Sequence, residues 1–289
     1  MGIVLAFFIG SIPNGVIVGK LYGRIDIRKH GSGNIGATNA VRQMGWGGGT
    51  LVFVLDFLKG LLGTLSMLLI LRFGLGLTGG WAYDWGMGLS LLATSCGHMF
   101  SPWLGFKGGK GITTSWGGFW LVSPWCGVTS IIAFAVFAIP TKRVSIGSIA
   151  GDVAYLLTTL IVYNSHVPLV IVSIVLFLIV LWAHRGNIDR LAHDEEAEFH
   201  AGSRETLEKA RAEERGEDTA AASARGEAAM ETEGSGDAVG CAARAGAEDA
   251  PPCEAAGGQD VREPRAGKKA DGKGAKAPSG QTVQAGEDI

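Results

Sequence analysis

Long apolar stretches alternate with short polar ones over roughly the first two thirds of the chain. Five apolar stretches approach the roughly 20 residues that an α-helix needs to cross a bilayer. They run over about 1–21, 51–71, 81–98, 146–163 and 167–183. A further stretch, 112–139, is interrupted by Ser123 and Pro124, so it fits either one long kinked helix or two short helices. The pattern predicts an all-α, polytopic membrane protein.

Basic residues decide between these two interpretations, because cytoplasmic loops of membrane proteins are enriched in Lys and Arg. They gather in the segments 20–42, 107–110, 142–143 and 185–190. All four segments lie on one side of a membrane only if 112–139 crosses twice. We therefore expect about seven transmembrane helices, with the N-terminus outside and the polar loops and C-terminus in the cytoplasm. A six-helix arrangement would place the basic pair at 142–143 outside and is disfavoured.

A change in composition near residue 193 divides the chain. Residues 1–193 contain 13 Lys and Arg against 5 Asp and Glu, whereas residues 194–289 contain 12 against 22. The second part has one aromatic residue, Phe199, so it cannot bury enough apolar surface to offset chain ordering. We predict a membrane domain, 1–193, and a mostly disordered, low-complexity tail, 194–289, in which about 194–230 suit a charged helix. The tail is either a docking segment for a soluble partner or a dispensable extension.

The first polar stretch contains a glycine-rich segment between two apolar ones. Residues 31–39 read GSGNIGATN, without an acidic side chain, and Arg28, Lys29 and Arg42 lie close by. Glycines let several backbone N–H groups turn toward one anion, and the Ser, Thr and Asn side chains add donors. The segment predicts a phosphate-binding site at a membrane surface.

Three further polar segments are predicted on the same side. Residues 105–111, GFKGGKG, combine four glycines with Lys107 and Lys110. The glycines favour an anion-binding role over simple anchoring of the lysines in lipid headgroups, and the Walker A pattern does not fit. The other two segments are KRVSIGS at 142–148 and HRGNIDRL at 184–191.

The last segment pairs a histidine with an amide. His184 and Asn187 are i and i+3, so they share a helix face if the helix continues, and they suit the hydroxyl groups of a polyol. Snorkelling to the interface explains Arg185 and Arg190 better than Asn187. His184 and Asp189 also fit the HxxxxD pattern of a known class of acyltransferases, but the second block of that class, a Pro-Glu-Gly-Thr-type segment, is absent.

Asp56, Lys59 and His98 lie within apolar stretches. Charged groups are costly in lipid when unpaired, so we expect an Asp56–Lys59 ion pair or contact with a polar cavity. The pair either orients the glycine-rich segment or is structural, and His98 is either a base or a structural donor. The sequence shows no metal-ligand spacing and no CxxC pattern, so we expect neither a metal nor a cofactor.

Five motifs together resemble the bacterial acyl-phosphate:glycerol-3-phosphate acyltransferases, the PlsY family. They are GSGNIGATN with Arg42, DFLKG at 56–60, GHMFSPWLGFKGGKG at 97–111, KRVSIGS at 142–148 and HRGNIDRL at 184–191. Their order and spacing match across 1–193, and the tail lies outside the resemblance. The resemblance implies seven helices in the bacterial inner membrane. It also implies transfer of an acyl group from acyl phosphate to the 1-hydroxyl of glycerol 3-phosphate, which gives lysophosphatidic acid and phosphate in phospholipid biosynthesis.

The resemblance also implies roles for single residues. The acyl-phosphate headgroup is expected on Ser32, Gly33, Asn34 and Thr38. The glycerol phosphate is expected on Arg42, Lys110 and Ser145, with Lys107 as a further binding residue and with His184 and Asn187 on the hydroxyls. The expected catalytic residues are His184, Lys110 and Ser32. Gly186 stands where many members carry Glu, so this position is not expected to be catalytic.

An acyl phosphate is already activated, so the expected mechanism is direct transfer between two positioned anions, without a metal or an acyl-enzyme. The expected partners are glycerol 3-phosphate, acyl phosphate, membrane lipids and the soluble enzyme that produces acyl phosphate, and no nucleic acid. Two rival classes are a phosphate-ester transporter and a membrane scaffold whose tail recruits soluble enzymes. A transporter would place its glycine-rich breaks near the midplane, typically within inverted repeats, and we find no repeat.

Overall fold

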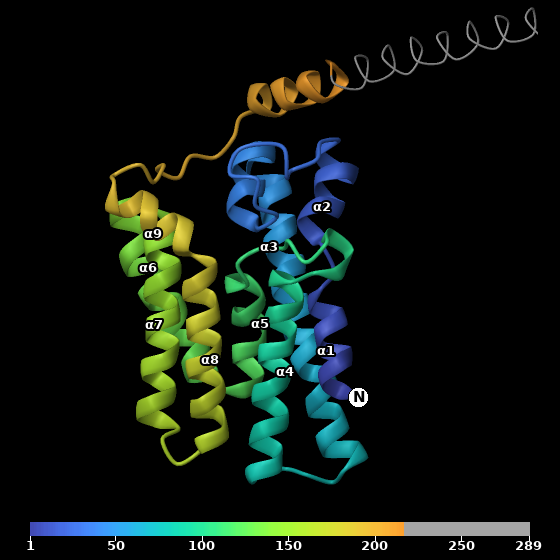
Figure 1. Cartoon of the computed structure of the whole chain (residues 1–289), viewed down its shortest axis with the longest axis vertical. Helices are drawn as coiled ribbons and strands as arrows, with labels where there is room; N and C mark the ends of the chain where they lie inside the picture. Colours follow the sequence, from blue (N-terminus) through green and yellow to red (C-terminus); the bar gives the residue numbers. More distant parts are fainter. Residues whose placement is uncertain (217–289) are drawn as a thin grey trace, which may run out of the picture. The chain divides into compact units, whose positions relative to one another are not determined.

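The computed structural model describes residues 1–216, and these residues form helices and connecting loops without a β-strand. The helices run side by side in a bundle (Figure 1), which confirms the all-α prediction. Their bounds are α1 (Gly2–Gly10), α2 (Asn14–Val18), α3 (Ala37–Leu69), α4 (Trp81–Met99), α5 (Ile112–Val122), α6 (Pro124–Thr141), α7 (Val144–Val162), α8 (Val167–Ala183) and α9 (Arg185–Ala192). Two π-helical turns, Gly19–Gly23 and Ile70–Gly74, and a short 3-10 turn, Pro102–Leu104, extend or connect them.

The first predicted span is broken rather than continuous. Helix α1 ends at Gly10, and α2 begins after Pro13. Proline has no N–H to donate to the preceding turn, so the helix is interrupted there. The carbonyl of Ile12 is left to accept a side-chain hydrogen bond from Lys59, at 2.8 Å.

The second span begins earlier than its apolar pattern indicates. Helix α3 starts at Ala37, not near residue 51, and runs through a break at Gly45, whose φ of 69° is not helical. Thr38, Asn39 and Arg42 therefore lie on a helix, and the glycine-rich segment is a loop that ends at its first turn. Tertiary contacts, described below, stabilise the polar start that propensity alone does not favour.

The stretch 112–139 forms two helices. Ser123 ends α5, its hydroxyl accepts a hydrogen bond from the Cys126 N–H at 3.3 Å, and Pro124 opens α6, as is common for proline at a first helical position. The 11 residues of α5 reach about 16 Å, half of a hydrocarbon core of roughly 30 Å. By length and composition, four helical segments among the described residues can cross a membrane, or five if the bent pair of α8 and α9 counts as one.

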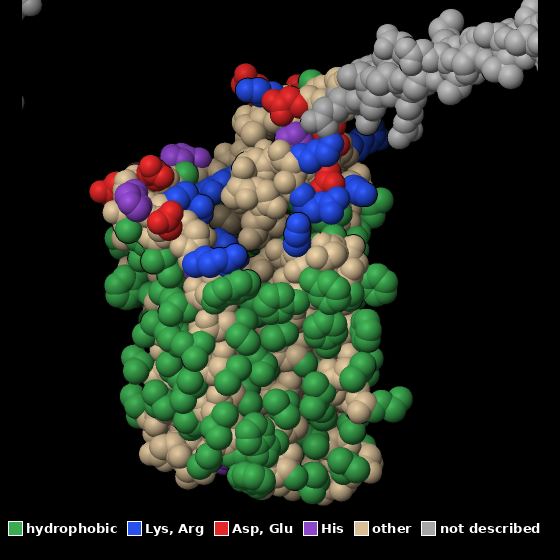
Figure 2. Space-filling model, viewed as in Figure 1, with side chains coloured by type: hydrophobic (Ala, Val, Ile, Leu, Met, Phe, Trp, Pro, Cys, Tyr) green, Lys and Arg blue, Asp and Glu red, His purple; other side chains and the backbone are tan. Residues whose placement is uncertain are grey.

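Hydrophobic side chains cover the flanks of the bundle, and Lys, Arg, Asp and Glu gather at one end (Figure 2). We call this the polar end; it contains residues 24–36, 105–111, 142–143 and 184–192. Such a surface is that of a multi-pass membrane protein, whose flanks face lipid. The chain continues from α9 through an extended segment, 194–203, into a helix over 204–216. This helix lies within the range predicted from composition, and the predicted disorder beyond it lies outside the described residues.

Candidate active site

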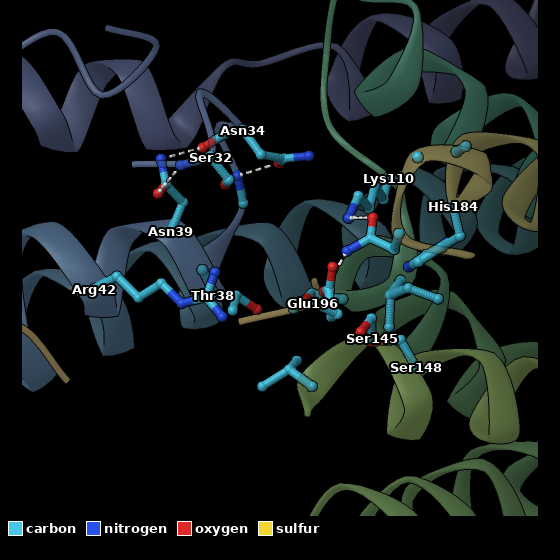
Figure 3. A pocket seen from close by; sticks show the side chains of 18 of the residues that line it. Ser32, Asn34, Thr38, Asn39, Arg42, Lys110, Ser145, Ser148, His184 and Glu196 are labelled. Carbon is cyan, nitrogen blue, oxygen red and sulfur yellow. Dashed lines mark hydrogen bonds between the residues drawn. The ribbon is translucent and has the colours of Figure 1, made fainter. Parts of the chain in front are cut away.

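A cavity of about 940 Å³ lies at the polar end. Eight of the ten residues singled out from the sequence line it: Ser32, Asn34, Thr38, Arg42, Lys110, Ser145, His184 and Asn187. They form two groups that face each other across the cavity, one from the glycine-rich loop and α3, the other from the 110 loop, α7 and the bend between α8 and α9 (Figure 3). Gly33 and Lys107 are not among the lining residues: Gly33 occupies a turn with φ of 67°, and Lys107 is exposed.

Asn39 organises the glycine-rich loop. Its side-chain N–H₂ donates to the carbonyls of Ile27 at 3.2 Å, His30 at 3.1 Å and Asn34 at 2.9 Å. Its carbonyl oxygen accepts from the backbone N–H of Ser32 at 3.1 Å. The side chain is almost fully buried, so one amide holds both ends of the loop against the start of α3. Because both are asparagines in the same motif, the sequence did not indicate that Asn39 has a different role from Asn34.

On the opposite wall, a chain of hydrogen bonds runs from Lys110 to Arg190. The Lys110 ammonium donates to the Asn187 side-chain oxygen, and the Asn187 N–H₂ donates to Glu196 at 2.6 Å. The other carboxylate oxygen of Glu196 accepts from Arg190 Nε at 2.8 Å. Glu196 lies beyond the motif at 184–191, and sequence reasoning assigned it to the tail. An acidic residue within a charged, low-complexity stretch gave no signal that would have found it.

Burial controls the charge of these groups. Desolvation lowers the pKa of Lys110 to about 8, against the opposing effect of the Glu196 charge. Burial by itself raises the pKa of Glu196, but contacts with Ser145, Asn187 and Arg190 outweigh it and hold the pKa below its usual value. Both groups are therefore charged near neutral pH, with the lysine within reach of titration.

His184 lies at the bend of 56° between α8 and α9. Its Nδ1 lies 2.9 Å from the carbonyl oxygen of Val180. A carbonyl only accepts, so Nδ1 carries the proton and Nε2 of the neutral ring is an acceptor. Burial, followed by the nearby Lys110 charge, lowers the pKa of His184 to about 4, so the ring is neutral at physiological pH.

Arg42 points toward the segment that follows α9. Its guanidinium donates to the carbonyls of Ala197 at 3.1 Å and Glu198 at 3.4 Å. Residues 195–198 and His200 also line the cavity. The start of the predicted tail therefore forms part of the cavity wall.

A buried polar network lies beneath the 110 loop. Lys59 forms the expected ion pair with Asp56, at 3.0 Å, and also contacts His98 Nδ1 at 2.8 Å. Asn14 donates to the same Asp56 oxygen at 3.1 Å. A Cβ on Gly109 would lie 2.1 Å from His98 Nε2. The network thus contacts Gly109 and the break between α1 and α2, and the hydrogen bonds of Asp56 and Lys59 within residues 1–216 link them to these elements rather than to the glycine-rich loop.

Part of the cavity lining is apolar. Phe53, Ile112, Trp116 and Phe134 contribute to its lining, and the Trp116 ring packs edge-on against Phe134 with centroids 5.1 Å apart. The cavity therefore joins cationic and hydroxyl groups at the polar end to an aromatic wall facing the bundle, which suits an amphiphile with an anionic head. Within residues 1–216, no group of three or more His, Cys, Asp or Glu side chains is arranged to hold a metal ion.

Comparison with known proteins identifies the family. The family model described as "Glycerol-3-phosphate acyltransferase" matches residues 1–194. The chain belongs to this family. Relatives of the same name include one from Thermoanaerobacter pseudethanolicus, 39% identical over 188 residues that cover 65% of this chain and 89% of the relative, and one from Bacillus subtilis, 37% identical over 195 residues that cover 67% and 94%.

Two crystal structures of PlsY, an integral membrane glycerol 3-phosphate acyltransferase, are also similar. The glycerol 3-phosphate form aligns with a TM-score of 0.61 and 35% identity, over 69% of this chain and 94% of that one. The lysophosphatidic acid form aligns with a TM-score of 0.58 and 34% identity over the same shares. The resemblance read from five motifs is thereby confirmed, and the protein is an integral membrane acyltransferase of this family.

Proposed function

We propose that this protein transfers an acyl group from acyl phosphate to the 1-hydroxyl of glycerol 3-phosphate and releases lysophosphatidic acid and phosphate. The observation that carries this proposal is the cavity, in which two anion-binding walls meet above an aromatic surface. PlsY, the similar solved protein, has a glycerol 3-phosphate form and a lysophosphatidic acid form. The choice of acyl phosphate as donor rests on the resemblance of the five motifs to the acyl-phosphate-dependent family.

The donor headgroup is assigned to the loop wall. Ser32, Asn34 and Thr38 offer hydroxyl and amide groups beside the first turn of α3. A helix N-terminus carries partial positive charge and free N–H groups, which favour phosphate. The acyl chain would lie along Phe53, Trp116 and Phe134, which stabilises the bound donor by about 0.8 kcal/mol per buried CH₂.

The acceptor is assigned to the opposite wall. Lys110, Arg42 and Ser145 bind the glycerol phosphate, and Asn187 and the free Nε2 of His184 take its hydroxyls. For this to occur, Arg42 exchanges its carbonyl partners at 197 and 198 for phosphate oxygens. The two cations offset the repulsion between the two phosphates.

The reaction then needs one displacement. The 1-hydroxyl oxygen attacks the acyl carbonyl carbon, the carbon–oxygen bond to phosphate breaks, and the Ser32 hydroxyl and loop N–H groups stabilise the oxyanion. His184, with a pKa of about 4, orients the hydroxyl by accepting its hydrogen bond. A phosphate group, with a second pKa of roughly 6, is the stronger base, so the proton leaves with the released phosphate.

The orientation is also part of the proposal. Basic residues cluster at the polar end. By the positive-inside rule, this end faces the cytoplasm, and the protein lies in the bacterial inner membrane. Water-soluble glycerol 3-phosphate reaches the cavity from that side, and a soluble enzyme supplies acyl phosphate there.

The test supplies the purified full-length protein with glycerol 3-phosphate and one donor at a time: acyl phosphate, acyl-CoA or acyl-carrier protein. Lysophosphatidic acid is expected from acyl phosphate alone. Product from either thioester, or uptake of glycerol 3-phosphate into proteoliposomes without product, would contradict the proposal. Trapping with labelled acyl phosphate is expected to give no acyl-Ser32 and no acylated cysteine.

A further inference from the structure

The helix over 204–216 begins ten residues beyond the end of the family match at 194, yet it contacts the segment that leads into the glycine-rich loop. We call it the anchor helix. It follows the segment 195–200 that lines the cavity and lies over the start of α3 and the loop before it (Figure 1). Its contacts give it a role that the family motifs do not assign.

The segment that leads to the anchor helix is hydrogen-bonded to the backbone of α3. The Gly202 N–H donates to the Val41 carbonyl at 2.9 Å. In a regular helix that carbonyl would accept from Gly45, which is where α3 departs from helical geometry. A Cβ on Gly202 would lie 2.0 Å from the Arg42 carbonyl oxygen. The break in α3 therefore leaves the Val41 carbonyl free for Gly202, and the lack of a side chain at Gly202 allows the close approach.

The anchor helix also completes a hydrophobic cluster. Ala210 is only 3% exposed and packs with Val16, Val18, Ile25 and Ile27. Leu207, one turn earlier, is partly buried against the same cluster. These partners lie on α2 and on the segment that leads into the glycine-rich loop, so the helix contributes to the core beneath that loop.

Polar contacts of the anchor helix reach the residue that precedes the loop. Glu214 accepts a hydrogen bond from the Asp26 N–H and lies 3.2 Å from His30 Nε2. Glu213 lies 3.5 Å from His30 Nδ1. Arg211 donates to the Gly23 carbonyl at 2.8 Å. Both ring nitrogens of His30 thus face carboxylates of the anchor helix.

His30 in turn contacts the loop through its backbone carbonyl. Its carbonyl accepts from the Gly33 N–H at 3.1 Å and from the Asn39 side chain at 3.1 Å. We propose that the anchor helix is a positioning element of the active site, which holds the glycine-rich loop through His30 so that Ser32 and Asn34 face the donor phosphate. This inference rests on the proposed function of the loop as the donor site.

The test uses Glu214→Leu in the full-length protein, with Glu208→Leu as the matched control. Glu208 lies on the same helix, is exposed and contacts only Arg204 among the contacts described here. Glu214→Leu is expected to raise KM for acyl phosphate about 5- to 10-fold, the value of one or two lost hydrogen bonds, and to leave KM for glycerol 3-phosphate unchanged. Glu214→Gln keeps an acceptor oxygen and is expected to recover most of the loss, which a purely ionic role would not permit.

Hydrogen exchange separates this inference from the proposed function. Amides of residues 26–39 are expected to exchange faster in Glu214→Leu than in the wild type and in Glu208→Leu, whether or not the protein uses acyl phosphate. Equal exchange in the three proteins would overturn the inference. An active wild type with equal KM for acyl phosphate in Glu214→Leu would overturn it as well, as would an equal rise in KM for both substrates. An inactive wild type with the expected exchange pattern would refute the donor assignment alone.

Discussion

Single side chains with little exposure to solvent set the chemistry of the cavity. Lys110 is the clearest case, because it contacts Asn187 and lies within electrostatic reach of Glu196, Arg190 and Arg42. Because its pKa is lowered to about 8, Lys110 loses its charge within a pH range in which activity can be measured. The chemistry of the acceptor wall therefore depends on a balance of charges, which the sequence motifs alone do not reveal.

The first prediction concerns the alkaline limit of activity. A cation that binds phosphate does so below its pKa, so kcat/KM for glycerol 3-phosphate is expected to fall as pH rises through about 8. Lys110→Arg keeps its charge to much higher pH and is expected to lose this limb, with some loss of rate from altered geometry. Lys110→Ala is expected to lower transfer at least about 100-fold without unfolding. Near-normal activity of Lys110→Ala would rule out its role.

The second prediction concerns Glu196. Its charge raises the pKa of Lys110, so Glu196→Gln is expected to lower that pKa and to move the alkaline limb to lower pH. Arg190 also loses its carboxylate partner, which is expected to raise KM for glycerol 3-phosphate. Rate against pH measures the first effect, and saturation curves at one pH measure the second. An unchanged limb would show that the two groups are not coupled.

At the scale of elements, helices far away in the sequence hold loops whose positions the loop sequence alone does not predict. The Gly105–Gly111 loop is held by backbone hydrogen bonds from Gly108 to the Met99 carbonyl, at 2.9 Å, and from Gly109 to the His98 carbonyl, at 3.1 Å. The ring of His98 lies under Gly109 and is held by Lys59 on α3. The ion pair within the membrane domain thus supports the loop that carries Lys110.

The third prediction tests this support with a double-mutant cycle. Gly109→Ala places a Cβ 2.1 Å from His98 Nε2 and is expected to displace Lys110 and raise KM for glycerol 3-phosphate. His98→Asn retains an acceptor for Lys59 but removes Nε2. The double variant is expected to recover part of the loss, with a coupling of about 1 kcal/mol or more. Gly79→Ala, where a Cβ meets nothing within 4 Å, serves as the control, and strictly additive losses would refute the contact.

At the scale of the whole molecule, the described part of the chain brings distant segments to one end of a helical bundle. The cavity takes residues from the loop before α3, from the loop before α5, from the start of α7, from the α8–α9 bend and from residues 195–200. These segments span more than 160 positions of sequence. Only a fixed topology across the membrane places them on the same side.

The fourth prediction concerns this topology. In a variant whose native cysteines are replaced by serine, single cysteines at Thr78 and Ser165 are expected to react with a membrane-impermeant maleimide added to intact cells. A cysteine at Thr141 is expected to react only after permeabilisation. All three positions are exposed, so burial does not account for a difference. Labelling of the Thr141 position from outside would support six crossings and reverse the proposed orientation of α7 and α8.

The sequence by itself determined the class of fold, the family and eight of the residues that line the cavity. Apolar stretches near the length of a bilayer leave few folds open, since backbone polar groups in lipid must pair within helices. Five ordered motifs then narrowed the chemistry, because four of them carry residue types that bind anions or hydroxyls. The break at Ser123 and Pro124 was also predictable from the sequence, because proline interrupts a helix interior.

Only the tertiary structure showed the early start of α3 and the hydrogen bonds by which Asn39 holds the glycine-rich loop. It also showed that Glu196 lines the cavity and that the anchor helix packs against the membrane domain. These features depend on contacts between residues far apart in sequence, such as Glu214 with Asp26 and Gly202 with Val41. Composition marks residues 194–216 as solvated tail because it counts their charges. It cannot show that Ala210 is buried in a hydrophobic cluster or that carboxylates contact His30 and Arg190, since burial and pairing are properties of the folded chain and not of residue type.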